Sequence, residues 1–130
     1  MSTDSNPAVA AIQDNLHLIF EEADATKRRA AIEQLWANSE DAVFVDPERI
    51  WRGHDEIDQC ITSLVEKFKG WVFVEIGDAQ LLPEKGPDGG MQVVRQAWGY
   101  GPPGEEPKVK GQDVATLVEG KIQMLVAILE

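Results

Sequence analysis

The feature that most constrains the fold is a change of hydrophobic period at Gly70. Before this glycine, apolar residues recur at intervals of three and four, which predicts amphipathic helices. After it, apolar and polar residues alternate, which predicts strands with one buried face. A chain with its helices first and its strands last is expected to fold as α+β, with the helices on one face of a curved antiparallel sheet.

Three helices are predicted in the first half of the chain. The first begins at Asn6-Pro7, where a capping side chain precedes a proline in the first turn. The second begins at Asp24 or Thr26 and ends near Asn38. The third spans residues 53–70, with acidic residues in its first turn and lysines in its last, as the helix dipole favours.

The second half of the chain predicts a four-strand antiparallel meander. Its last two strands are separated only by Glu119-Gly120, the length of a tight hairpin turn. A bulge is expected at Gly77-Asp78, and two short strands precede the third helix. The predicted strands lie within residues 42–47, 50–52, 71–82, 91–100, 108–118 and 121–129.

Length and charge limit the functional classes. The chain of 130 residues is expected to form one domain over 1–130, with residues 1–6 disordered. A net charge of −11 argues against nucleic acid and anionic membranes as partners. No apolar run is long enough to span a bilayer, nothing resembles a signal peptide, and Cys60 has no disulfide partner. We therefore expect a cytoplasmic protein whose partner is a small apolar molecule.

Several motifs resemble the nuclear transport factor 2-like superfamily, and more narrowly its SnoaL-like branch, which is related to polyketide cyclases and ketosteroid isomerases. The resemblance covers nearly the whole chain and implies a cystatin-like roll. In that roll a cone-shaped sheet carries three helices on its concave face and a small-molecule pocket at its mouth. The matching motifs are LWANSEDAVFVDP (35–47), RGHDEID (52–58), KGWVFVEI (69–76), VVRQAWGYGPPG (93–104) and KGQDVATLVEGKI (110–122).

Asp46 is the first candidate catalytic residue. It ends an apolar strand at the point where Pro47 interrupts the ladder. The resemblance to ketosteroid isomerase implies that Asp46 is the general base and Asp113 a second, protonated acid. The alternative for Asp46 is a turn in which the side chain caps its own backbone. The same resemblance places Phe20 where a phenol is expected, so half of the oxyanion hole is missing.

Arg95 is the third candidate. It matches the arginine of limonene-epoxide hydrolase, but Ala97 and approximately Ala127 replace that enzyme's two carboxylates, so epoxide hydrolysis is not expected. Counting in steps of two from Arg95 places it on the cavity face beside Asp113. The two residues are expected to form a structural ion pair, or Arg95 binds a carbonyl or enolate oxygen.

The same counting divides the aromatic residues between two surfaces. Val94, Trp98 and Tyr100 are expected on the outer face of the sheet, where they predict a homodimer interface. His17 and His54 lack metal-ligand spacing, and no glycine-rich phosphate loop is present, so no metal or cofactor is expected. The residues expected to contact the ligand are Phe20, Trp36, Trp51, Leu64, Phe68 and Leu117.

The leading hypothesis is a cofactor-independent acid/base enzyme of isomerase or cyclase type that acts on an apolar carbonyl compound. Asp46, Asp113 and Arg95 are its predicted catalytic residues. The alternative is a non-catalytic domain that binds a hydrophobic ligand or assembles as a dimer. The missing partners at Phe20, Ala97 and Ala127 favour that alternative.

Overall fold

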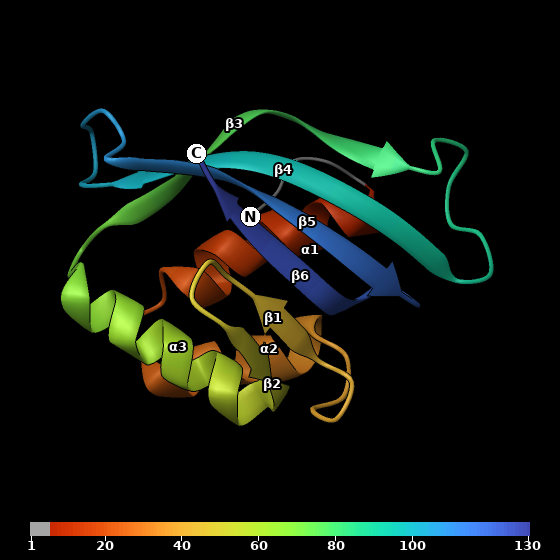
Figure 1. The fold of residues 1–130 in the computed structure, drawn as a ribbon, viewed down its shortest axis with the longest axis horizontal. Helices are drawn as coiled ribbons and strands as arrows, with labels where there is room; N and C mark the ends of the chain where they lie inside the picture. Colours follow the sequence, from red (N-terminus) through yellow and green to blue (C-terminus); the bar gives the residue numbers. More distant parts are fainter. Residues whose placement is uncertain (1–5) are drawn as a thin grey trace.

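A curved six-stranded sheet arches over the first helix of the chain (Figure 1). The computed structural model describes residues 6–130 and confirms the predicted α+β fold, with helices before Gly70 and long strands after it. In chain order the elements are α1 (Pro7–Asp14), the π-helix η1 (Asn15–Phe20), α2 (Ala25–Leu35), β1 (Val43–Val45), β2 (Ile50–Arg52), α3 (Gly53–Lys67), β3 (Val72–Leu82), β4 (Met91–Gly101), β5 (Val109–Val118) and β6 (Lys121–Leu129).

Helices α1 and α2 begin at the predicted capping residues. Asn6 Oδ1 accepts hydrogen bonds from the backbone N–H groups of Ala8 and Val9, at 2.8 and 3.3 Å, and so satisfies two donors at the start of α1. Of the segment 1–6 predicted to be disordered, residues 1–5 lie outside the described residues, whereas Asn6 is the cap. Asp24 Oδ1 caps α2 by accepting from the N–H of Lys27 at 2.9 Å.

The sheet has the strand order β2-β1-β6-β5-β4-β3. Strands β3 to β6 form the predicted antiparallel meander, but β1 runs parallel to β6, so the complete sheet is mixed. Glu119 and Gly120 join β5 to β6 with φ angles of 51° and 78°, as a tight hairpin turn requires. The register of β3 shifts between Ile76 and Gln80, which confirms the predicted bulge.

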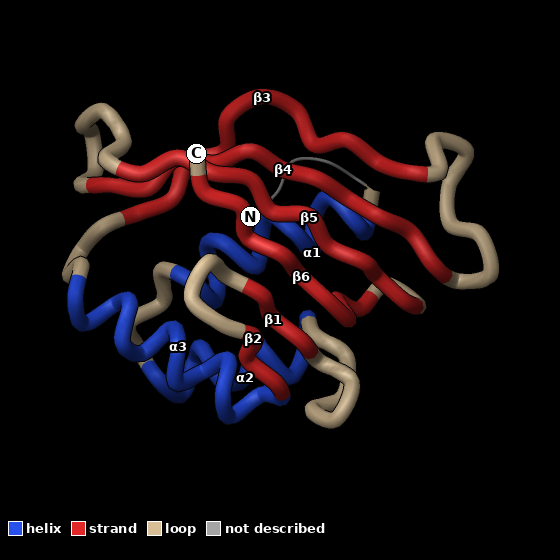
Figure 2. The backbone as a smooth tube through the Cα atoms, viewed as in Figure 1, coloured by secondary structure: helices blue, strands red, loops and turns tan. Residues whose placement is uncertain are grey.

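The core lies between the inner face of the sheet and the helices, which gather on one side of it (Figure 2). Ile12 and Ile19 are completely buried there because α1 and η1 follow the curvature of the sheet. α3 packs against α2 on one side and against β1 and β2 on the other. Between Asn6 and Glu130, no helix is both long and apolar enough to cross a membrane.

Candidate functional site

The register of β4 against β5 decides which side chains face the helices. Asp113 lies opposite Gln96, and both are buried on the inner face. Even-numbered residues of β4 therefore point inward from Gln92 to Tyr100, whereas Arg95 points outward. The predicted inner face is correct for Asp113 on β5 but wrong for β4, because an offset of one residue moves every side chain of a strand to the opposite face.

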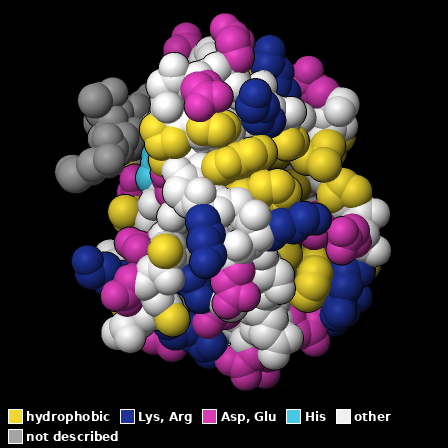
Figure 3. All heavy atoms as spheres, turned by 90° about the vertical axis from the view of Figure 1, so that its left-hand side faces the viewer, with side chains coloured by type: hydrophobic (Ala, Val, Ile, Leu, Met, Phe, Trp, Pro, Cys, Tyr) yellow, Lys and Arg dark blue, Asp and Glu magenta, His cyan; other side chains and the backbone are white. Residues whose placement is uncertain are grey.

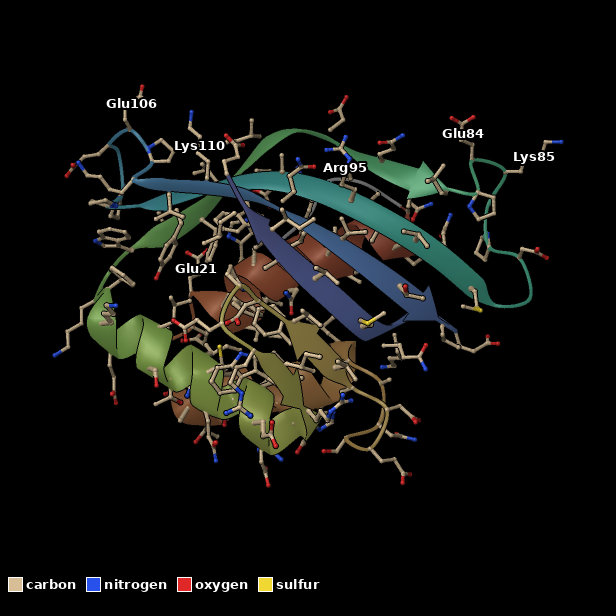
Figure 4. All side chains as sticks on the ribbon, in the orientation of Figure 1. Glu21, Glu84, Lys85, Arg95, Glu106 and Lys110 are labelled. Atoms are coloured by element: carbon tan, nitrogen blue, oxygen red, sulfur yellow. The ribbon has the colours of Figure 1, made fainter. Side chains whose placement is uncertain are left out.

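The side chain of Arg95 consequently lies on the outer face of the sheet and not in the cavity, where it was predicted. Its Nε donates to Gln80 Oε1 at 3.2 Å and its Nη1 to Gln112 Oε1 at 2.7 Å, both on neighbouring strands. Figure 4 shows Arg95 on the side of the sheet away from the helices, whereas Glu21 lies on the helix side. The expected ion pair of Arg95 with Asp113 is wrong, and so is its contact with a ligand in the pocket.

The inner face encloses a cavity of about 510 Å³. It lies between η1, α3, the turn after β1 and the inner face of β3 to β6. Figure 3 views the end of the molecule at which α3 and β3 meet, and shows hydrophobic side chains gathered in a band with charged side chains on either side. The predicted site residues that line this cavity are Phe20, Asp46, Trp51, Leu64, Phe68 and Asp113.

Two residues predicted to contact the ligand lie elsewhere. Trp36 is 1% exposed, and its indole N–H donates to Asn15 Oδ1 at 2.9 Å inside the core. Its backbone is extended beyond the end of α2, its ring contacts Asn15 at the start of η1, and it does not line the cavity. Leu117 lies four residues beyond Asp113 on β5 and borders a separate hollow beside Pro7. Both predictions are therefore wrong.

Asp46 caps its own turn and also lines the cavity. Its Oδ1 accepts from the N–H groups of Glu48 and Arg49, each at 2.9 Å, and so caps its own turn. Its Oδ2 accepts from the Trp51 indole N–H at 3.1 Å and lies 3.9 Å from the Cys60 thiol. The same carboxylate thus holds the turn with one oxygen and borders the cavity with the other.

Cys60 is not a nucleophile in this setting. Burial raises its pKa to about 12, and the negative charge of Asp46 adds to that effect. The thiol therefore remains protonated at neutral pH and serves as a weak donor to Asp46.

Asp113 occupies a very different environment in the middle of β5. Its side chain is 4% exposed, and its one hydrogen bond comes from the Trp98 indole N–H to Oδ1 at 2.9 Å. Burial raises the pKa of Asp113 to about 7, although the bond from Trp98 acts in the opposite direction. A large fraction of Asp113 is therefore protonated at neutral pH and able to donate a proton.

The inner face of β3 and β4 forms an aromatic wall beside Asp113. Phe73 stacks on Tyr100 with a centroid distance of 4.2 Å and meets Trp98 edge-on at 5.3 Å. Because Val94, Trp98 and Tyr100 are buried on this face, the prediction that they form an outer dimer interface is wrong. Asp113 is buried and lies opposite Gln96, so the even-numbered residues of β4 share its face. The prediction placed Arg95 beside Asp113 and was therefore wrong by one residue.

Tyr100 is the functional candidate that the sequence analysis missed. It is the only tyrosine of the chain, and it lines the same cavity as Asp46 and Asp113. Burial raises the pKa of Tyr100 to about 12, with a smaller contribution from the charge of Glu21. Its hydroxyl therefore stays neutral and can donate a hydrogen bond, as the phenol absent at Phe20 was expected to do.

Both histidines have structural partners. His17 bonds to Glu21 through Nδ1 and to Glu75 through Nε2, the latter at 2.7 Å. Hydrogen bonding to Glu21 raises the pKa of His17 more than burial lowers it. His54 Nε2 lies 2.8 Å from the carbonyl oxygen of Ala37. Within residues 6–130, no three His, Cys, Asp or Glu side chains are grouped so as to hold a metal ion.

Comparison with known proteins finds similarity among solved structures. No family model and no curated protein matches the chain. A candidate isomerase of the SnoaL-like family from Agrobacterium tumefaciens is 28% identical, with a TM-score of 0.78 over 95% of this chain and 97% of that chain. A nuclear transport factor 2-like superfamily protein from Salmonella enterica serovar Typhimurium has a TM-score of 0.71 at 16% identity, over 92% of this chain and 85% of that chain.

A candidate polyketide cyclase from Sinorhizobium meliloti shares the fold at 19% identity, with a TM-score of 0.58 over 91% of this chain and 93% of that chain. The chain therefore has the nuclear transport factor 2-like fold. Its similarity to the SnoaL-like candidate isomerase agrees with the branch that its motifs predicted.

Proposed function

We propose that the chain is a cofactor-independent acid/base enzyme of isomerase or cyclase type that acts on an apolar carbonyl compound. The observation that carries the proposal is the placement of two unlike carboxyl groups, Asp46 and Asp113, on one aromatic cavity. The SnoaL-like candidate isomerase and the candidate polyketide cyclase among the similar structures support the same reaction types.

In this proposal Asp46 is the base. Its Oδ2 removes a proton from the carbon next to the ligand carbonyl, and the electron pair of the broken C–H bond moves into an enolate. The proton then returns from Asp46 to another carbon of the ligand. Alternatively, the enolate carbon attacks a second carbonyl carbon of the same molecule, the C=O π bond of that carbonyl breaks, and its oxygen takes the proton from Asp46. The first outcome is an isomerisation and the second a cyclisation.

Asp113 and Tyr100 stabilise the enolate. A protonated Asp113 and the neutral Tyr100 hydroxyl each donate a hydrogen bond to the oxygen as its negative charge develops. Donors in a cavity closed by aromatic rings act more strongly than donors in water, because the local dielectric is low. These two groups replace Arg95 in the role that the sequence suggested for it.

Exchange of α-protons for deuterium tests the proposal without knowledge of the natural substrate. A panel of apolar cyclic ketones is incubated with the protein in D₂O, and exchange is followed by NMR. We expect the protein to accelerate exchange for at least one planar member of the panel. Asp46→Asn and Asp113→Asn should each reduce the rate by about 100-fold or more, in the range of general acid–base catalysis.

Asp41→Asn is the matched control, because Asp41 is exposed in the loop before β1 and does not line the cavity. Exchange that survives in Asp46→Asn would contradict the base role. Ligands that bind the cavity without any exchange would instead favour the alternative, a non-catalytic domain that binds a hydrophobic molecule.

We also propose that two copies associate through the outer face of the sheet. This face exposes Val74, Ile76, Met124 and Ile128, each between 41% and 53%. The outward-facing residues of β4 to β6 include no carboxylate, although the chain carries a net charge of −11. Two copies can therefore approach through this face with little like-charge repulsion.

Light scattering after size-exclusion chromatography tests the assembly. We expect a dimer that Ile128→Glu converts to a monomer, because the substitution places a charge within the apolar face. Leu18→Glu adds the same charge at an exposed apolar residue outside the sheet and should leave the dimer intact. A wild-type protein that is monomeric at high concentration would contradict the proposal.

A further inference from the structure

The arrangement of Trp98 around Asp113 depends on a glycine. Trp98 lies directly opposite Gly111 in the ladder, whereas Asp113 lies two residues further along β5. Directly opposite residues of an antiparallel pair project from the same face, and a large aromatic side chain can reach the diagonal neighbour. Trp98 makes such a diagonal contact, since its Nε1 lies 2.9 Å from Asp113 Oδ1.

Gly111 leaves the space that the tryptophan ring occupies. A Cβ atom on Gly111 would lie 2.8 Å from Trp98 Cζ2 and 3.0 Å from Cη2. It would also lie 2.7 Å from the carbonyl oxygen of Ile128 on β6. Any side chain at this position would therefore displace the ring that carries the indole N–H. Phe73 meets the same ring edge-on, which further restricts its orientation.

The two oxygens of Asp113 consequently differ. The indole N–H is a donor only, so the oxygen that it contacts must act as an acceptor. Oδ2 has no hydrogen-bond partner among residues 6–130. It is also not fully buried, because it is not among the fully buried side-chain atoms that lack a partner. Because Asp113 lines the cavity, this second oxygen is the one left open to a ligand.

We propose that Trp98 and Gly111 form a positioning pair that makes Asp113 present its proton from Oδ2 to the ligand oxygen. Gly111 provides room for the ring, and the ring occupies Oδ1. Only the consequence for catalysis rests on the proposed function, because the orientation of the carboxyl group belongs to the free protein. A carboxyl group that turned freely would present its O–H to the cavity for only part of the time.

Carbon NMR of the Asp113 carboxyl group and proton–nitrogen NMR of the Trp98 indole test the pair. In the wild type we expect the indole signal to shift with the same midpoint as Asp113, because the two groups share a hydrogen bond. In Trp98→Phe a smaller aromatic ring replaces the indole and the N–H donor is lost, so the pKa of Asp113 should rise by about one to two units. Gly111→Ala should also raise the pKa of Asp113 and remove the pH-dependent step from the Trp98 indole signal.

Trp71→Phe is the matched control, since Trp71 packs against Phe68 and Tyr100 without reaching Asp113. Because Asp46, Glu48 and Lys67 border the same cavity, the titration is repeated in Asp46→Asn to identify the step that belongs to Asp113. An Asp113 titration that is unchanged in Trp98→Phe would overturn the proposal, and so would an indole signal without a pH step.

These measurements require no substrate and therefore separate the positioning pair from the proposed function. If the NMR result is as expected but no ketone exchanges, the function fails and the carboxyl orientation stands. If exchange is found but the titration of Asp113 is unchanged in Trp98→Phe, the positioning pair is contradicted and the proposed function is not. Should Gly111→Ala prevent folding, Trp98→Phe still decides the question, because it adds no atom to the core.

Discussion

Asp46 and Asp113 border one cavity but are held by opposite means. Asp46 belongs to a turn and accepts hydrogen bonds from Glu48, Arg49 and Trp51, whereas Asp113 lies inside the sheet with a single bond from Trp98. Many donors suit an anion, whereas burial with one donor suits a protonated acid. The surrounding structure, and not the residue type, therefore makes these two identical side chains chemically different, as the proposed base and acid roles require.

The largest expected effect is on the pH dependence of stability. Asp113 titrates at about 7 in the native protein and near the ordinary value of 3.8 when unfolded. Between these values the unfolded chain releases a proton that the native state retains, so stability falls as the pH rises. The loss amounts to about 4 kcal/mol at most, at about 1.4 kcal/mol per pKa unit.

Urea unfolding of wild type and Asp113→Asn from pH 4 to pH 8 measures this loss, which the amide variant should lack. The difference between the two proteins isolates Asp113 from the other acids of the chain. Parallel pH profiles would mean that the native protein does not raise the pKa of Asp113.

A smaller effect is expected from the turn. Asp46→Ala removes the acceptor of two backbone N–H groups and of Trp51, whereas Asp46→Asn keeps one oxygen acceptor. We expect the alanine variant to be less stable than the asparagine variant by about 1–2 kcal/mol in urea unfolding. Equal stabilities would show that Asp46 does not hold the turn, and the contrast with Asp113 would then disappear.

Trp51→Phe tests the second oxygen of Asp46. In the wild type the Arg49 guanidinium lies 4.2 Å from the Trp51 ring centroid, and the phenyl ring keeps an aromatic face for it while the indole donor is lost. We expect a cost of about 1 kcal/mol or less in unfolding free energy, because Asp46 is partly exposed and water can replace the donor. Trp71→Phe provides a comparison at a tryptophan that lies outside the turn.

The smallest effect is expected at Arg95. Because its side chain bonds to Gln80 and Gln112 on the outer face, Arg95→Gln should leave α-proton exchange unchanged. The resemblance of Arg95 to a catalytic arginine predicts the opposite. A marked fall in exchange, with the fold intact by circular dichroism, would restore Arg95 to the site.

The sequence was sufficient for the order of elements, because helix and strand periods are local properties. Asn6, Asp24 and Glu119-Gly120 were identified correctly for the same reason, since caps and tight turns are encoded within a few residues. The parallel pairing of β1 with β6 joins segments that are far apart in the chain, so the local sequence pattern does not predict it.

The site was predicted only in part, because the face of a strand depends on register. Asp46 was identified from a strand that ends at Pro47, a local signal. Arg95 and Tyr100 were assigned to the wrong faces because the counting began at Arg95 and not at Asp113. A buried carboxyl group is the better starting point, because its burial restricts the neighbouring side chains more than a partly exposed arginine does.

The most direct test of the central claim is a crystal structure with a planar apolar phenol, whose oxygen imitates that of an enolate. We predict that this oxygen lies within hydrogen-bond distance of Tyr100 Oη and Asp113 Oδ2, with the ring plane between them and Asp46. A phenol that binds with its oxygen away from both donors, for example at Lys67, would contradict the account.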